Sequence, residues 1–178
     1  MTEMKYELIL NTISKFISLD EVEKEYFISI IKFKFLKKDE LLICEGDICR
    51  NEYFVNKGCL KSYYLDEEGI EHILDFSIEG WWAEDLHSFF TETPSSTNIQ
   101  AIENTELIIL NKSDVENLYR KIPKFEKFFR LSFQNAYIAQ RERIIANLSI
   151  SAEHRYKIFL KKYPYSQDRF LQKDIASY

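Results

Sequence analysis

Apolar residues change their spacing at Phe33 and again after Leu110, and this change limits the possible folds more than any other property of the sequence. Between these points they alternate or form short runs, at Phe33–Leu36, Leu41–Cys44, Tyr53–Val55, Cys59–Leu65, His72–Phe76, Ile99–Ile102 and Leu107–Leu110. Turn residues separate the runs, and no helical pattern alternates with them. The pattern predicts roughly eight short strands in an antiparallel roll or jelly roll, within an α+β fold.

Helical spacing flanks this region on both sides. Two short helices are expected in the first thirty residues, the second after a capping box at Ser18–Glu21. A second capping box at Ser113–Glu116 predicts a helix after the last strand. The roll should therefore carry helices before and after it.

A long helix is predicted from Lys124 to Leu148, because Pro123 starts it and nothing interrupts it. Its apolar residues lie on several faces, so the helix must be covered on several sides. One side can lie on the roll, and a parallel helix from a second chain is the expected cover for the other. The alternative is a helix enclosed within one chain. The residues expected to face the partner are Phe128, Leu131, Phe133, Tyr137, Ile138, Ile144 and Ile145.

Charge is distributed unevenly along the chain. Residues 1–119 carry 11 Lys and Arg against 24 Asp and Glu, whereas residues 120–178 carry 13 against 5. A basic segment after an acidic one favours contact of the second part with a polyanion such as nucleic acid. A basic helical surface without a ligand is the alternative.

The C-terminal segment predicts a small helical unit. Ser151 is a candidate N-cap, and the helix that follows ends near Tyr163-Pro164. A further helix starts at Gln172, and the chain ends within it at Tyr178. We expect this unit to be incomplete in the 178 residues.

Several classes of protein find no support in the sequence. The N-terminus lacks the basic and then apolar pattern of a secretory signal, and no window approaches 18 apolar residues, so a cytoplasmic protein without a membrane segment is expected. Cys44, Cys49 and Cys59 form no CxxC pair and are expected to be buried, reduced thiols. No catalytic motif, phosphate-binding loop or metal spacing is present, so neither an enzyme nor a metal site is predicted. A haem ligand at His72 or His87 is the one metal alternative.

The order of these elements resembles the Crp/Fnr family of bacterial transcription regulators. Glu45-Gly46-Asp47, Tyr53–Gly58 and the turn at Asp66–Gly69 are similar to the turns of that family's cyclic-nucleotide-binding roll. The stretches Ser151–Tyr156 and Gln172–Tyr178 resemble the entry into its winged helix-turn-helix. The resemblance implies an effector domain at residues 1–123, a dimerisation helix at 124–148 and the start of a DNA-binding domain at 149–178.

The sequence departs from the family at the nucleotide site. Members that bind cyclic AMP carry a cassette like Phe-Gly-Glu-Leu, followed about ten residues later by an arginine that neutralises the phosphate. With the cassette placed on residues 81–86, Glu84 takes the acidic position, Ala83 replaces the glycine and Ser95 replaces the arginine. No cation occurs between residues 80 and 101. We therefore expect no useful affinity for cyclic AMP.

The same place in the roll is a candidate pocket for a different effector. The candidate pocket residues are Trp81, Trp82, Ala83, Glu84, Ser95 and Ser96. An uncharged or aromatic ligand could lie against the two tryptophans. Packing of both tryptophans in the core is the alternative, and no cofactor is predicted.

The resulting prediction is a homodimeric DNA-binding transcription regulator with an unidentified small-molecule effector or none. DNA would bind through the complete C-terminal domain, with Arg155, Arg169 and Lys173 as candidate phosphate contacts. The alternative is a ligand-binding sensor or dimerisation module that does not bind DNA.

Overall fold

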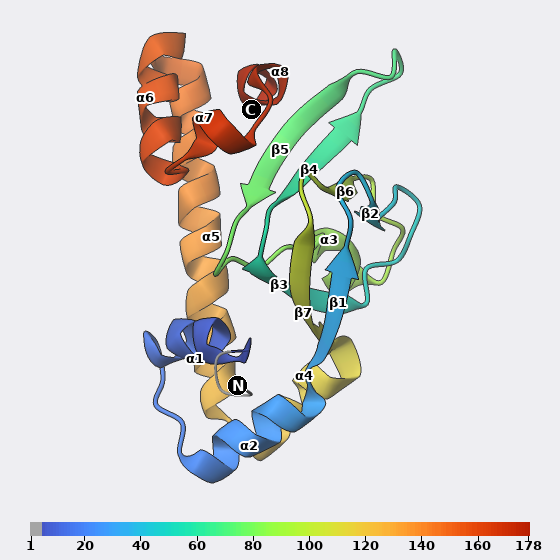
Figure 1. Cartoon of the computed structure of the whole chain (residues 1–178), viewed down its shortest axis with the longest axis vertical. Helices are drawn as coiled ribbons and strands as arrows, with labels where there is room; N and C mark the ends of the chain where they lie inside the picture. Colours follow the sequence, from blue (N-terminus) through green and yellow to red (C-terminus); the bar gives the residue numbers. More distant parts are fainter. Residues whose placement is uncertain (1–4) are drawn as a thin grey trace.

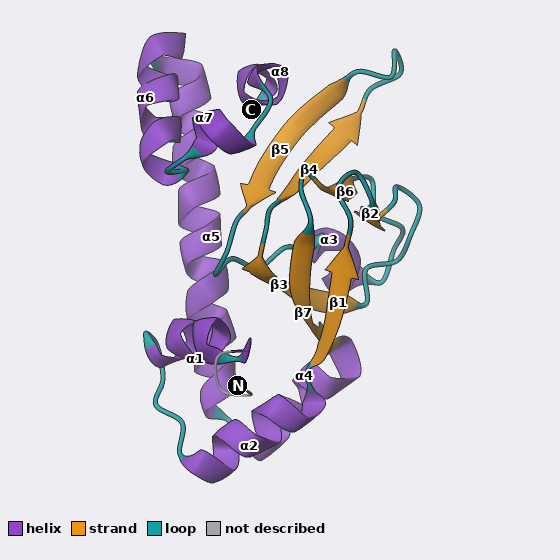
Figure 2. Cartoon of the chain, in the orientation of Figure 1, coloured by secondary structure: helices purple, strands orange, loops and turns teal. Residues whose placement is uncertain are grey.

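A roll of two antiparallel sheets packs against helices from both ends of the chain in the computed structural model, which describes residues 5–178 (Figure 1). The helices are α1 (Glu7–Ser14), α2 (Glu21–Ile30), α3 (Leu86–Thr91), α4 (Lys112–Lys121), α5 (Lys124–Ser149), α6 (Ala152–Lys162), α7 (Ser166–Arg169) and α8 (Gln172–Ser177). The strands are β1 (Lys32–Leu36), β2 (Leu41–Ile43), β3 (Asn51–Lys57), β4 (Leu60–Leu65), β5 (Glu71–Ser77), β6 (Asn98–Ala101) and β7 (Thr105–Asn111) (Figure 2).

The sheets have the strand orders β1-β7-β3 and β2-β6-β4-β5, and every pairing is antiparallel. The predicted α+β fold with an antiparallel roll is confirmed, with seven strands in the described part of the chain where roughly eight were expected. Alternation along β3 explains how the roll is filled. Tyr53 and Val55 point into the core between the sheets, while Phe54 points to the helices outside.

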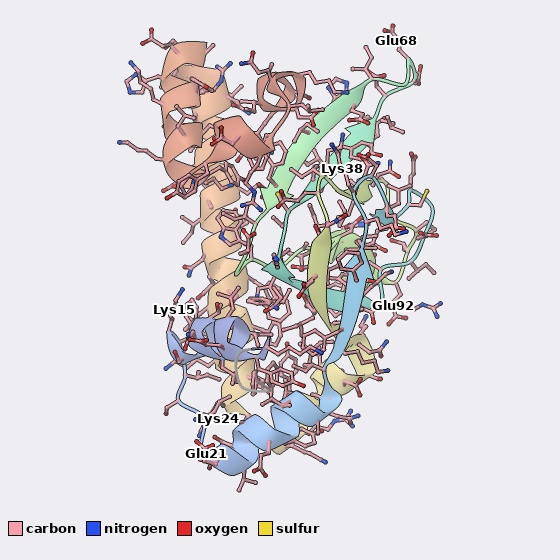
Figure 3. All side chains as sticks on the ribbon, in the orientation of Figure 1. Lys15, Glu21, Lys24, Lys38, Glu68 and Glu92 are labelled. Atoms are coloured by element: carbon pink, nitrogen blue, oxygen red, sulfur yellow. The ribbon has the colours of Figure 1, made fainter. Side chains whose placement is uncertain are left out.

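That second, helical core joins α1, α2, α4 and the first half of α5 to the outer face of β3 and β7. The fully buried Phe27 stacks on Phe125 at a ring-centroid distance of 5.2 Å, and Phe128 packs edge-on against Phe16. Figure 3 shows side chains filling the space between these helices, while Glu21 and Lys24 lie on the outer surface of α2. The first half of α5 is thus part of the protein's own core.

The helix starts differ from the expected capping boxes. Asp20, rather than Ser18, caps α2: its carboxylate accepts from the backbone of Glu23, and the Glu23 carboxylate accepts from the backbone of Asp20. At α4 the cap is Asn111, whose side chain accepts from the backbone of Ser113. In both places several residues with capping side chains are adjacent, and the path of the preceding chain decides which one has the extended backbone that a cap needs. The predicted cap of α6 at Ser151 is confirmed.

The C-terminal helices α6, α7 and α8 fold back on the roll instead of standing apart from it (Figure 1). Phe159, Tyr163 and Phe170 pack with Phe76 of β5 in a third core. The Phe76 and Phe170 rings are stacked with centroids 4.3 Å apart. The second half of α5 runs beside this unit and leaves apolar side chains on its other side exposed.

Candidate functional site

The predicted effector cassette runs along the edge of β3. The backbone of Val55 donates to Trp81 O at 2.9 Å, and that of Ala83 donates to Tyr53 O at 2.7 Å. The segment therefore behaves as a short extended piece, in which neighbouring side chains point to opposite sides. Ala83 faces the core between the sheets, and Trp82 faces the helical core.

The two tryptophans do not form one pocket. Trp82 contacts Phe54 and Phe129 at centroid distances of 5.3 and 5.4 Å, which places it in the helical core. Trp81 packs at 5.6 Å from Tyr163 of the C-terminal unit. The aromatic effector pocket between them is therefore wrong, and packing in the core, the alternative, describes both residues.

Glu84 lies opposite Glu52 of β3. The Glu52 side chain is 1% exposed, its two carboxyl oxygens have no hydrogen-bond partner among the described residues, and burial raises its pKa from 4.5 to about 7. Burial, together with the charge of Glu52, also raises the pKa of Glu84 well above its ordinary value. Two carboxyl groups this close in a buried place cannot both be charged without a large cost, so the pair retains a proton near neutral pH. The sequence did not single out Glu52, since a lone glutamate in a strand resembles any surface residue.

Asp85 lies at the start of the helix α3. It caps α3, with its Oδ1 atom accepting from the backbone of Ser88 at 3.1 Å. Leu86 follows Asp85 as the leucine follows the acidic residue in the family pattern, so a placement one residue later, with Asp85 instead of Glu84 at the acidic position, also fits the sequence. Strand alternation puts Asp85 on the side of Ala83 and turns Glu84 toward Glu52.

Ser95, which stands at the arginine position, is bonded directly to Asp85. Its hydroxyl donates to Asp85 Oδ2 at 2.6 Å, and the Thr97 hydroxyl donates to the same atom at 3.4 Å. The predicted turn at Glu45-Gly46-Asp47 holds the Ser95 backbone through Gly46 N to Ser95 O at 2.8 Å and Ser95 N to Asp47 O at 2.7 Å. Ser96 points away and is exposed. The Asp85 carboxylate thus accepts hydrogen bonds from residues of the same segment.

Of the candidate DNA contacts, Arg169 is already engaged with the roll. Its guanidinium pairs with both oxygens of Glu79 at 3.0 Å and also with Glu103, and these carboxylates raise its pKa. The assignment of Arg169 as a free phosphate contact is corrected accordingly. Arg155 donates to Ile150 O at 2.9 Å, and Lys173 is exposed on α8.

The predicted dimer residues separate into two groups along α5. Phe128 is fully buried in the chain's own core and cannot face a partner, which corrects that assignment, and Leu131 and Phe133 are half-buried. The exposed group is Tyr137, Ile138, Ile144 and Ile145, to which the structure adds Leu148 at 84% exposure. An apolar stripe therefore remains uncovered on the second half of α5.

The cysteines and histidines form no cluster in the described residues. Cys49 and Cys59 are buried as expected, and burial raises the pKa of the Cys49 thiol to about 11, whereas Cys44 is exposed, contrary to expectation, because it leaves β2 at a turn. His72 pairs with Asp66 at 2.7 Å, and His87 is exposed. Within residues 5–178 no group of three His, Cys, Asp or Glu could hold a metal ion. No helix in that range has the length and apolar character needed to cross a membrane.

Comparison with known proteins decides the family. The sequence model of the cyclic nucleotide-binding domain matches residues 33–121, half of the chain. This chain belongs to the cyclic nucleotide-binding domain family. The matched range begins within β1 and ends with α4, so the domain comprises the roll, α3 and the helix after it.

The relatives of this domain extend the match into the helices. The chain is 26% identical over 146 residues to the anaerobic regulatory protein of Haemophilus influenzae, and 28% identical over 146 residues to the fumarate and nitrate reduction regulatory protein of Vibrio cholerae. Each match covers 80% of this chain but only 55% and 57% of the relative. The chain thus spans little more than half the length of these regulators, and the resemblance to Crp/Fnr regulators is confirmed.

Solved structures support the fold. A cyclic nucleotide-binding domain from Methylobacillus flagellatus superimposes with a TM-score of 0.71 at 17% identity, covering 84% of this chain and 88% of that one. The sensor domain of the transcriptional regulator DNR from Pseudomonas aeruginosa gives a TM-score of 0.62 at 19% identity, covering 84% of this chain and all of the other. At these identities the likeness establishes the architecture and not the ligand.

Proposed function

We propose that this chain is the sensor and dimerisation part of a DNA-binding transcription regulator that acts in the cytoplasm and has no enzymatic activity. The observation that carries the proposal is the match to regulatory proteins over 80% of the chain, which includes more than the nucleotide-binding roll. Residues 1–123 are the effector domain, 124–148 the dimerisation helix and 149–178 the start of the DNA-binding unit.

Pairing of two α5 helices would make the dimer. The stripe of Tyr137, Ile144 and Leu148 repeats at helical spacing, and each of these side chains is more than half exposed. An apolar stripe of this kind on a long helix is buried most simply by the same stripe of a second copy about a two-fold axis. A two-fold dimer would present two basic C-terminal units to a two-fold DNA site.

The roll is proposed not to use cyclic AMP. A phosphate bound beside Ser95 would lie near the Asp85 carboxylate, to which the Ser95 hydroxyl donates, without the arginine that neutralises the phosphate in the family. The segment between residues 80 and 101 supplies no Lys or Arg to offset the phosphate charge. Two anions at one site repel, so nucleotide binding would require removal of the Asp85 charge or its compensation.

Calorimetric titration with cyclic AMP tests this part of the proposal. The natural chain should give no binding heat, whereas the triple variant Glu84→Gly, Asp85→Glu, Ser95→Arg restores the family cassette and should bind. A matched variant with only Ser96→Arg adds the same charge one residue away and should remain silent. Micromolar or tighter binding by the natural chain would overturn the assignment.

Selection of bound fragments from random DNA tests the regulator itself, with the full-length natural protein as bait. Enrichment of a two-fold symmetric motif is the expected result, and Lys173→Glu should weaken binding to all fragments alike because a phosphate contact carries no base preference. A dimer that enriches no sequence would favour the sensor module without DNA binding.

A further inference from the structure

A cavity of about 1350 Å³ lies between the second half of α5, the helices α6 and α8, and Trp81. It is separate from the cassette, which contributes only Trp81 to its wall. We propose that this cavity binds an amphipathic anion, a molecule with an apolar body and one carboxylate or phosphate group. This inference adds the class of effector to the proposed function. Its regulatory meaning rests on that function.

The cavity and the exposed apolar stripe lie on different faces of α5. The helix contributes Ala139, Glu142, Arg143, Ala146 and Asn147 to the cavity, a set with spacings of three and four residues. At about 100° per residue this face is centred roughly 160° from the face of Tyr137, Ile144 and Leu148. A second copy that covers the stripe therefore leaves the cavity open to a small molecule.

The body of the ligand would lie against an apolar wall. Small side chains at Ala139, Ala146, Ala152 and Ala176 leave the space, and Ile158, Phe159 and Ile175 provide larger apolar surface. Such a mixture of small and large apolar groups around a hollow is typical of small-molecule sites. The wall comes from three helices, α5, α6 and α8, in the last third of the chain.

The charged part of the lining selects an anion. Arg143, Arg155, Lys161 and Lys162 line the cavity, against the single acid Glu142. Lys162 pairs with Asp75 at 3.2 Å, but in the described residues no carboxylate lies within ion-pair distance of the other three cations. Arg143 and Arg155 each donate to a backbone carbonyl, of Leu74 and Ile150, and an arginine has further donors to offer an anion.

The position of the cavity connects the ligand to regulation. A molecule bound there would contact α5, which carries the proposed dimer stripe, together with α6 and α8 of the C-terminal unit. It would therefore fix the angle between the dimer helix and the DNA-binding unit, if it binds one arrangement more tightly than another.

Binding of simple probes to the full 178-residue chain tests the site without DNA. Decanoate and octyl phosphate, used below their micelle concentrations, present the two anionic heads, while decanol and decyltrimethylammonium present a neutral and a cationic head. We expect one decanoate or one octyl phosphate per chain by calorimetry, and at least about tenfold weaker binding of decanol and of the cation. The tighter of the two anions identifies the head group.

Paired variants locate the site. Arg143→Gln should weaken anion binding at least about fivefold, whereas Arg141→Gln, an exposed arginine on the same helix outside the lining, should leave it unchanged. Ala146→Phe fills the cavity and should abolish binding, while Ala136→Phe adds the same ring at an exposed position outside it. Melting curves identify any variant that fails to fold, and the arginine pair retains the test in that case.

Equal binding of all four probes, no binding of either anion, or equal loss in Arg141→Gln and Arg143→Gln would each overturn the proposal. Because these measurements use neither DNA nor cyclic AMP, such a result leaves the proposed regulator to be judged by its own experiments. Enrichment of DNA with no anion binding would mean a regulator without this effector.

Discussion

At the scale of single residues, Glu52 and Glu84 place two carboxyl groups against each other inside the protein. Glu52 is on β3 and Glu84 is in the cassette segment beside it, so a charge on either residue affects the packing of the cassette segment on β3. Trp82, two residues before Glu84, packs on α5. The protonation of the pair should therefore affect the packing of the cassette segment against α5.

The pair should make stability depend on pH. The pKa of folded Glu52 is about 7, above its ordinary 4.5, so the folded state holds the proton more tightly than the unfolded chain. The stabilisation is full below the unfolded value and is lost as pH rises through about 7. The free energy of unfolding, measured with denaturant at about pH 5 and pH 8, should fall less between the two pH values in Glu52→Gln than in the natural chain, by roughly 1–2 kcal/mol.

Glu106→Gln is the matched control, since Glu106 is an exposed strand residue. Its two unfolding free energies should differ by as much as those of the natural chain. If Glu52→Gln keeps the full pH dependence, the loss of stability arises from other groups.

Gly58 is the second residue on which the fold depends locally. It follows β3 with φ at +97°, and a Cβ atom there would come within 2.7 Å of the Asn104 carbonyl oxygen. Gly58→Ala should therefore cost more than the about 1 kcal/mol of a positive φ alone. Gly46→Ala has a similar φ of +92° and open space around it, so the difference between the two variants in thermal or denaturant unfolding measures the clash.

At the scale of elements, the two halves of the single helix α5 have different surroundings. Its first half is held by Phe125, Phe128 and Phe129 in the helical core, and its second half carries the exposed stripe. Core packing fixes the direction in which the second half leaves the roll. A partner chain would therefore meet a stripe of defined orientation.

Replacement of the stripe should separate the dimer without unfolding the chain. Ile144→Lys with Leu148→Lys places two charges where apolar contact is expected, and sedimentation should show a monomer at concentrations where the natural chain is a dimer. Ala136→Lys, exposed on the other side of the helix, should remain a dimer. A natural chain that is monomeric at high micromolar concentration would contradict the pairing.

The elements themselves could be predicted from sequence, because periods of two and 3.6 residues persist over whole strands and helices. Every strand lies within about two residues of an apolar run, and α5 ends one residue after its predicted end. What failed depends on single positions. The caps at Asp20 and Asn111 and the role of Asp85 each depend on a shift of one or two residues, which a periodic pattern does not resolve. The partners of Arg169 are 66 and 90 residues away in the sequence, where no local pattern could reveal them. The positive charge of Arg169 therefore suggested contact with nucleic acid, whereas the structure pairs it with the roll.

At the scale of the whole molecule, ion pairs hold the C-terminal unit against the roll. Arg169 connects α7 to Glu79 and Glu103, and Lys61 of β4 pairs with Glu71 and lies 3.8 Å from Asp174 of α8. These contacts surround the aromatic core around Phe76. The surface with the proposed DNA contacts is therefore held in place by the roll.

Arg169→Gln should loosen this attachment. Two acidic partners would lose their cation, so hydrogen exchange should rise in α6, α7 and α8 and in β5, with little change in α1 and α2. The local opening free energy should fall by roughly 1–3 kcal/mol. Lys157→Gln breaks only an exposed pair with Glu153 and should change exchange hardly at all. Unchanged exchange in the arginine variant would mean that the aromatic core alone holds the unit.

The two tryptophans, adjacent in the chain, sit in different cores, and this arrangement gives the protein two built-in optical reporters. Trp81 lies against Tyr163 of the C-terminal unit, and Trp82 lies against Phe129 of α5. The chain contains no other tryptophan. In a Trp81→Phe variant the emission comes from Trp82 and reports on the packing of the long helix. In a Trp82→Phe variant it comes from Trp81 and reports on the packing of the C-terminal helices.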